Sequence, residues 1–377
     1  GIAEGFAERY LNGVESCLVI SPPFGGKTTF LRDLGRIYSD KYEKGLSLYT
    51  KGIFIKDKCS ELVPDYLKFI KGLVDCDDFP LNISRERLQA SPLRKKISDA
   101  IEKKVVEKLK DRQKNEKDKY LKFNKLFGNY IKGGIYSSYG AKKDTLQDLL
   151  RYATYKHEEP ISLSQYVKER KPDQKEIYFA SGKTKESIKL LPQREAYVKK
   201  DEDVLFLRDD IDEFTLRVRQ DYDKKPFKNI ESASGDDLSK EEKDKLETAK
   251  REHKRFLDTL TESLKGKVDE VSFSSKLVSS PVCLSTKEGL SRNRERVLDG
   301  QAKREGEEEN APKSVKVLEI NPESDLFKAR SKLDDDKVKE YGSVLYDEAR
   351  LISGFEIDDK EDFLKKLNSL RVLALSK

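Results

Sequence analysis

The longest helical pattern in the sequence covers residues 92–127, and it constrains the fold more than any other stretch. Apolar positions recur at every fourth residue: Ile97, Ile101, Val105 and Leu109. At this spacing the apolar side chains share one face of an α-helix. Charged residues, chiefly lysine, fill most of the remaining positions, and pairs of lysine and glutamate among them stabilise a solvated helix surface. The pattern therefore predicts a long amphipathic helix that buries a narrow stripe against a core.

Strand and helix patterns alternate along much of the remaining chain. The segment SELVPDYLKFIKGLV predicts an amphipathic helix at residues 60–74. Apolar runs predict strands at 176–181 (EIYFAS) and 203–207 (DVLFL), and IDEFTLRVR predicts a helix at 211–219. This alternation is typical of an α/β layer.

The composition excludes several classes of protein. Charged residues make up 39% of the 377 residues, but Tyr and Phe each occur 17 times, which is unlike a disordered chain. The 76 basic and 70 acidic residues are interspersed and give a formal net charge of +6, so no nucleic-acid partner is expected. No apolar run is long enough to form a transmembrane helix, so no membrane partner is expected either.

The cysteine and histidine content predicts neither a metal site nor a disulfide framework. Four cysteines occur without CxxC spacing, and the two histidines lie far from any cysteine pair. Isolated thiols fit a reducing compartment, which predicts a cytoplasmic location. The chain begins at Gly1 and contains no Met, which suggests a fragment or an engineered sequence.

Residues 21–36, SPPFGGKTTFLRDLGR, match part of a phosphate-binding loop. Gly26, Lys27 and Thr28 occupy the last three positions of the pattern G-x-x-x-x-G-K-[ST], whereas Ser21 stands at the first glycine. The loop follows an apolar run and precedes a helical pattern, where backbone N–H groups can hold a phosphate. Lys27 would bridge phosphate oxygens and Thr28 would bind Mg²⁺.

This loop lacks the rest of a nucleotide-hydrolysing domain. Residues 1–41 resemble the phosphate-loop region of the stage III sporulation protein AA family of ATPases. A working domain of this class also needs a parallel sheet and an acidic residue after an apolar strand. Asp209 and Asp210 follow such a strand, but they lie far along the chain. A structurally incomplete segment is therefore the preferred interpretation of residues 1–41.

From Tyr42 to the C-terminus, the sequence resembles the ninety-kilodalton heat-shock chaperone family, particularly its bacterial type. The resemblance is carried by long segments, among them YEKGLSLYTKGIFIKDKCSELVPDYLKFIKGLVDCDDFPLNISRERLQ, ISLSQYVKERKPDQKEIYFASGKTKE, KLVSSPVCLST and VKVLEINPESDLF. It covers far more of the chain than the phosphate-loop motif does. In that family the segment containing Asp209 and Asp210 is a strand and turn, which removes their interpretation as metal-shell residues.

The resemblance implies a fold class and a division of the chain. The strand–loop–helix segment 1–41 would precede a middle domain at 42–238 and a C-terminal dimerisation domain at 239–377. The implied class is an α/β middle domain, built from two αβα layers joined by helices, followed by a small α+β dimerisation domain. Amphipathic patterns at about 334–352 and 360–374 match the helices through which the family forms a homodimer. The implied partners are unfolded or partly folded client proteins.

The resemblance also implies a catalytic position. In the family, ATP and Mg²⁺ bind a separate N-terminal domain, none of whose signatures is recognisable in this sequence. In LNISRERLQ, the family's catalytic arginine corresponds to Arg85, and Asn82 and Gln89 match its supporting polar positions. A planar, permanently charged guanidinium can neutralise charge on a transferring phosphoryl group. From the residues alone, Arg85 could instead pair with a neighbouring carboxylate such as Glu86.

The sequence departs from the family where methionine is replaced by a cation. Lys56, Arg87 and Arg294 stand at such positions. The segment around 290–298 resembles an amphipathic helix that offers a methionine-rich surface to clients, and methionine suits adaptable contacts. Arg294 and Arg296 bring charge instead, so apolar client binding is expected to be weakened.

Three hypotheses follow from the sequence. The first is a chaperone consisting of middle and C-terminal domains, which binds clients and dimerises. The second is a P-loop ATPase that uses Lys27 and Thr28. The third is a chimera with neither activity. The first is preferred because its resemblance covers most of the chain.

Overall fold

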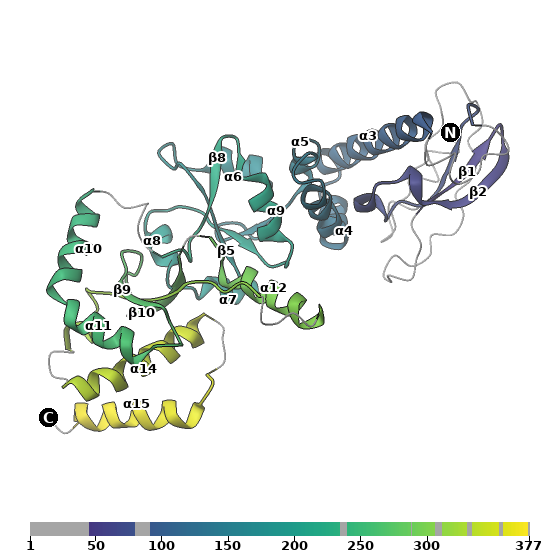
Figure 1. Cartoon of the computed structure of the whole chain (residues 1–377). Coiled ribbons are helices and arrows are strands. Elements are labelled where there is room, and N and C mark those ends of the chain that lie inside the picture. The colour runs from purple at the N-terminus through teal and green to yellow at the C-terminus, as the bar shows by residue number, and fades with distance from the viewer. Residues whose placement is uncertain are drawn as a thin grey trace. The chain divides into compact units, whose positions relative to one another are not determined.

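The computed structural model describes residues 45–79, 91–233, 240–287, 289–305, 311–329, 334–353 and 357–375 (Figure 1). Segment 1–41 and both predicted domain boundaries, near residues 41 and 238, lie outside these residues, so the division into domains stays a prediction. The chain forms two compact units. The first comprises Gly1–Arg151 with Ser162–Ser164, and the second comprises Tyr152–Ile161 with Gln165–Lys377.

A small mixed sheet opens the described part of the first unit. Strand β1 (Leu46–Thr50) pairs with β2 (Ile53–Cys59) in antiparallel and with β3 (Leu73–Asp75) in parallel orientation. Lys51 and Gly52 both have positive φ, 52° and 76°, which suits the two-residue turn between β1 and β2. The Asp75 carboxylate accepts a hydrogen bond from the Gly52 N–H at 3.1 Å and ties this turn to β3.

The helix predicted at residues 60–74 is wrong. Two short 3₁₀ turns, η1 (Ser60–Leu62) and η2 (Asp65–Leu67), occupy the segment before β3. Pro64 lacks an N–H group and disfavours helical geometry in the residue before it, and Val63 is accordingly extended (φ −129°, ψ 124°). A continuous helix is therefore interrupted within its first turns.

The long helical pattern forms two helices, α3 (Pro92–Asn115) and α4 (Lys117–Ser137), rather than one. The chain leaves helical geometry at Glu116, where φ is −138° and ψ is 57°. The predicted stripe on α3 is buried at Ile101, Val105 and Leu109. The unit continues into α5 (Lys143–Leu146) and η3 (Gln147–Leu149).

A five-stranded sheet forms the first part of the second unit. The strands are β4 (Ala153–Thr154), β5 (Ile177–Ser181), β6 (Leu205–Leu207), β7 (Asp221–Tyr222) and β8 (Lys225–Asn229), in the order β4-β6-β5-β8-β7. Strand β5 lies parallel to both β6 and β8. Helices α7 (Lys185–Lys189), α8 (Arg194–Lys199) and α9 (Asp212–Arg219) belong to this part, and α6 (Leu163–Glu169) begins at the boundary of the two units. The strands and the helix predicted at 176–181, 203–207 and 211–219 are confirmed.

The second part of this unit surrounds a three-stranded sheet. Strand β11 (Lys316–Ile320) lies between antiparallel β10 (Val282–Thr286) and parallel β9 (Glu270–Phe273). The helices are α10 (Lys240–Glu252), α11 (Lys254–Ser263), α12 (Arg292–Glu305), α13 (Asp325–Lys328), α14 (Asp335–Ile352) and α15 (Lys360–Leu375). Helix α14 packs against α11, α15 and β10, as Figure 1 shows.

The described residues have the mixed α/β character that the sequence predicts, with three small mixed sheets. The arrangement in two αβα layers and a dimerisation domain stays a prediction. Within the described ranges, no helix has both the length and the apolar character needed to cross a bilayer.

Polar side chains join the two parts of the second unit. The Glu195 carboxylate of α8 accepts hydrogen bonds from the Val278 and Ser279 N–H groups at 2.8 and 2.7 Å. It also accepts hydrogen bonds from the Ser279 and Ser280 hydroxyls at 2.9 and 2.6 Å. Gln193, just before α8, donates to the Leu284 carbonyl of β10 at 2.8 Å. We call these contacts of Gln193 and Glu195 the junction, because they fix β10 relative to the five-stranded sheet.

The junction makes stability depend on pH in a defined direction. Burial alone would raise the pKa of Glu195, but hydrogen bonds from Ser280, Ser279 and Val278 outweigh it and lower the pKa from 4.5 to about 2. A carboxyl group whose pKa is depressed in the folded state stabilises that state above its unfolded pKa. This contribution is lost as the pH falls from 4.5 toward 2.

Replacing Glu195→Gln is therefore expected to lower the free energy of unfolding by about 1–2 kcal/mol at pH 7, because charge-assisted hydrogen bonds are lost. The difference from the unchanged protein should shrink as the pH falls below 4.5. Urea titrations at several pH values measure both quantities. Glu241→Gln, on the exposed start of α10, is the control and should follow the unchanged protein at every pH. If the difference in the free energy of unfolding between Glu195→Gln and the unchanged protein stayed the same at low pH, this explanation would be wrong.

Candidate functional site

The site residues predicted from the sequence lie outside the described part of the chain. They are Gly26, Lys27 and Thr28 of the phosphate-loop motif, and Asn82, Arg85 and Gln89 of the loop between β3 and α3. Their roles stay predictions.

A groove of about 230 Å³ lies in the second unit, where the two sheet-containing parts meet. One wall comes from β5, α9 and β8, and the other from the end of β10 and the start of α12. Residues on its surface include Phe179, Phe227, Asn229, Thr286, Ser291 and Arg294. Backbone pairing links the segment after β8 to the end of β10, since the Ala233 N–H donates to the Thr286 carbonyl at 2.8 Å. The groove is thus built by segments far apart in sequence.

Buried acids anchor the start of α12. The Ser291 hydroxyl donates to the Glu213 carboxylate of α9 and also accepts from the Arg294 N–H at 3.1 Å, so it caps the helix. Arg292 forms an ion pair with Glu231, and both side chains are largely buried. These contacts fix the direction in which α12 leaves the groove.

The described lining residues of the groove include more cations than carboxylates. Lys228, Lys287 and Arg294 line it, and Glu213 is the carboxylate among its described lining residues. Burial raises the pKa of Glu213, although hydrogen bonds from Ser181 and Ser291 lower it in part. Lys287 also pairs with Glu270 at 2.7 Å, across an exposed surface where such pairs are screened.

Arg294 and Arg296 lie in different environments, although the sequence groups them together. The Arg294 guanidinium lies over the Phe214 ring at 5.7 Å and donates to the Gly289 carbonyl at 2.8 Å. Arg296 instead forms an ion pair with Asp210 at 2.5 Å and does not line the groove. The Asp210 carboxylate thus has Arg296 as its partner, and no metal ion is needed to explain its position. Within the described ranges, no cluster of three or more His, Cys, Asp or Glu side chains is placed to hold a metal ion.

The groove offers both apolar and polar groups to a ligand. The ring of Phe227 is only partly buried and offers apolar contact, while Asn229, Thr286 and Ser291 offer polar groups. We therefore treat the groove as the candidate functional site.

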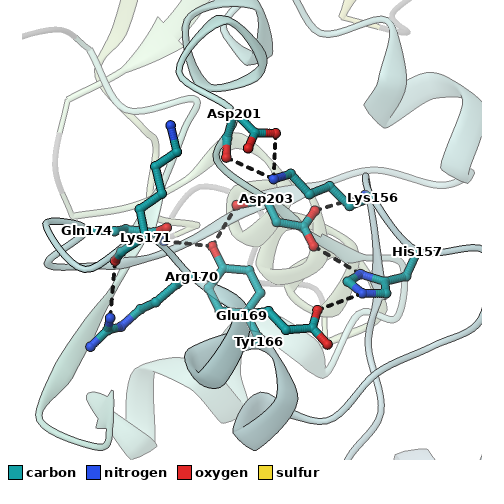
Figure 2. Close-up of a pocket in the computed structure, with 9 residues that line it drawn as sticks. All are labelled: Lys156, His157, Tyr166, Glu169, Arg170, Lys171, Gln174, Asp201 and Asp203. Carbon is teal, nitrogen blue, oxygen red and sulfur yellow. Dashed lines mark hydrogen bonds and ion pairs between the residues drawn. The ribbon is translucent and has the colours of Figure 1, made fainter.

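His157 lines a second pocket together with Tyr166, Glu169 and Asp203 (Figure 2). The His157 Nε2 atom lies 2.8 Å from Glu169 Oε2, and Nδ1 lies 3.3 Å from Asp203 Oδ2. Because the two carboxylates face opposite ring nitrogens, they cannot join the imidazole around one ion. The Tyr166 hydroxyl donates to the Asp203 carbonyl at 2.6 Å. The pocket holds about 30 Å³, enough for a water molecule, so we interpret this cluster as a structural support.

Sequence reasoning located only part of the groove. The segment around 290–298 was identified by resemblance, and it supplies Arg294 and Ser291. Phe227, Asn229 and Glu213 were missed, because their positions within a strand and a helix carry no signal of a shared surface. They come together only in the folded unit, where they line one groove with the end of β10.

Comparisons with known proteins show the family to which the chain belongs. The family model described as "Hsp90 protein" matches residues 30–377, which begin after Gly26, Lys27 and Thr28. The chaperone protein HtpG of Clostridium acetobutylicum is 41% identical over 336 residues, which cover 88% of this chain and 53% of that protein. HtpG of Shouchella clausii is 40% identical over 338 residues, which cover 89% of this chain and 53% of that protein. The chain spans about half the length of the curated relatives it matches, and it belongs to the Hsp90 family.

Proposed function

We propose that the protein is a molecular chaperone that binds unfolded or partly folded client proteins in the groove beside α12. The observation that carries this proposal is the groove itself, which combines the partly buried ring of Phe227 with polar groups at the start of a firmly anchored helix. Membership of the Hsp90 family and the similarity to HtpG chaperones support it.

The groove offers the contacts that an extended client segment needs. Phe179 is almost fully buried in β5, whereas Phe227 of β8 is only partly buried and can meet a ligand. An apolar side chain placed against Phe227 would lose contact with water, and this burial is the main source of affinity. The amide of Asn229 and the hydroxyls of Thr286 and Ser291 can orient the polar backbone.

Shortening Phe227→Ala is expected to reduce suppression of client aggregation several-fold, because the apolar wall of the groove is removed. Light scattering of a heat-denatured client protein measures this effect. Leu190→Ala is the matched control, since Leu190 is 70% exposed and does not line the groove. Phe227→Leu keeps most of the side-chain volume and should give an intermediate loss of activity. This variant separates the loss of the apolar contact from misfolding of the alanine variant. Equal activity of Phe227→Ala and Leu190→Ala would refute the assignment.

We also propose that the protein forms a homodimer through α14 and α15. Helix α15 packs on α14, yet Leu364 and Leu375 of α15 are 52% and 86% exposed. Eleven residues separate them, which places both on one face of the helix. Apolar side chains that share an exposed face often mark a contact between protein chains. The dimerisation that the family resemblance implies supports the same surface.

The double variant Leu364→Glu, Leu375→Glu is expected to convert dimers to monomers, because two charges would be buried in the contact. Multi-angle light scattering reports the mass directly. Leu190→Glu places a charge at an equally exposed leucine outside these helices and should remain dimeric. A double variant that keeps the mass of the unchanged protein would exclude this surface.

We further propose that Arg85, supported by Asn82 and Gln89, contributes to ATP hydrolysis in the complete chaperone, with ATP and Mg²⁺ bound elsewhere. Family membership and the segment LNISRERLQ support this role. A P-loop ATPase that uses Gly26, Lys27 and Thr28 is the alternative. A cytoplasmic location is also proposed, and the buried free thiols Cys59, Cys76 and Cys283 are compatible with it.

Titration with a fluorescent ATP analogue and Mg²⁺ should give the same curve for the unchanged chain and for Lys27→Ala. Micromolar binding that Lys27→Ala abolishes would favour the P-loop alternative. In a fusion of the nucleotide-binding part of C. acetobutylicum HtpG to residues 42–377, Arg85→Ala should lower ATP turnover by about 10³-fold or more. Glu86→Ala is the neighbouring control, and an equal loss there would contradict the specific role of Arg85.

A further inference from the structure

We propose that helix α3 carries a docking surface for an extended acidic polypeptide segment, formed by lysines on its solvent-facing side. We call Lys96, Lys103, Lys110 and Lys114 the lysine row. The row belongs to the first unit, whereas the groove beside α12 belongs to the second. The proposal is therefore separate from client binding in the groove, and a failure of one leaves the other standing.

The two long helices of the first unit concentrate positive charge. Residues 92–137, which span α3 and α4, contain 14 lysines and arginines against 6 aspartates and glutamates. This excess of eight is larger than the formal net charge of +6 of the whole chain. Lysine and glutamate pairs can stabilise a solvated helix without such an excess. The excess favours a negatively charged partner outside the two helices.

The lysine row lies opposite the buried stripe of α3. Seven residues make almost two turns of an α-helix, so Lys96, Lys103 and Lys110 follow one another along one side. Lys114 continues the row, because it lies five full turns beyond Lys96, and the row is about 27 Å long. Its side chains are exposed, whereas Val105 on the opposite side is 4% exposed. Packing of the apolar stripe thus holds the row toward solvent.

The charges of the row are available within the described part of the chain. The side chains of Lys96, Lys103 and Lys114 form no hydrogen bond or ion pair with another described residue. Lys110 lies 3.7 Å from Asp148, and both of these side chains are more than 40% exposed. Such an exposed pair is weak, so an acidic ligand can compete for Lys110.

The acidic residues beside the row do not cancel its charge. Glu107 pairs with Lys104 at 3.3 Å, and Asp111 pairs with Lys108 at 3.1 Å. Both of these lysines lie on the flank of the helix and outside the row. Asp99 is the further carboxylate close to the row, and it offsets one of the four charges at most. The row therefore keeps a net positive charge.

The shape and composition of α3 favour a polypeptide among the possible polyanions. An extended chain advances about 3.3 Å per residue, so about eight residues span the row. Single-stranded nucleic acids are held by aromatic stacking as well as by charge, and α3 contains no aromatic residue. A helix that lies on a membrane inserts its apolar face into the lipid, whereas the apolar stripe of α3 is buried in the protein.

Fluorescence anisotropy with labelled peptides tests the proposal on the whole chain. The peptides consist of serine and glycine, with Glu, Gln or Lys at every third position. The Glu peptide is expected to bind about tenfold more tightly than the Gln peptide, and the Lys peptide most weakly. Added salt should weaken binding of the Glu peptide, because exposed charges are screened. Equal binding of the Glu and Gln peptides would overturn the proposal.

A triple variant removes the unpaired part of the row: Lys96→Gln, Lys103→Gln and Lys114→Gln. It should weaken binding of the Glu peptide about tenfold, because three contacts with carboxylates are lost. Glutamine has nearly the helix propensity of lysine, so α3 should keep its structure, which circular dichroism checks.

A second triple variant is the matched control, with the same change of net charge on the exposed surface of α10: Lys240→Gln, Lys243→Gln and Lys245→Gln. It should bind the Glu peptide like the unchanged protein. An equal loss in both variants would show an effect of net charge alone and would overturn the docking surface.

Two further probes test the class of partner, a thymidine oligonucleotide and vesicles that contain phosphatidylglycerol. Both are expected to bind more weakly than the Glu peptide. Tighter binding of either probe, lost in the variant of the lysine row, would overturn the assignment to an acidic polypeptide.

Discussion

The hydrogen bonds of Glu195 to residues 278–280 set the geometry on which the candidate site depends. One wall of the groove belongs to the five-stranded sheet and the other to β10 and α12, so the groove exists only while these parts keep their relative position. A carboxylate that accepts several hydrogen bonds at once fixes distance and direction together, which a single apolar contact does not. Gln193, bonded to β10, and the Arg292–Glu231 pair at the start of α12 extend the same constraint to the groove.

The sequence predicted burial more reliably than backbone geometry. Leu62, Tyr66 and Phe69 are buried, as their spacing indicated, yet they lie on 3₁₀ turns and a loop rather than on a helix. The apolar pattern indicates which side chains are buried, whereas Pro64 determines the backbone geometry of the segment that buries them. The stripe on α3 was likewise predicted correctly at Ile101, Val105 and Leu109, but nothing in the charged pattern marks the break at Glu116.

Prediction of the candidate site from the sequence was limited in a similar way. Resemblance located the start of α12, because residues along one helix are close in sequence. The opposite wall could not be predicted, since Phe227 of β8 and Glu213 of α9 share a surface only once the chain has folded. The family is established over most of the chain, and the groove suggests how this member differs, with Arg294 where the family resemblance leads one to expect methionine.

A groove with walls from two parts of one unit also has a thermodynamic consequence. Any ligand that touches both walls, such as the proposed client segment, adds its binding free energy to the contacts that hold the parts together. Coupling of this kind is reciprocal, so contacts that favour binding are themselves strengthened by the bound ligand to the same extent. Occupancy of the groove and the orientation of α12 would therefore be linked, and the polar contacts of Gln193 and Glu195 would respond to a bound ligand.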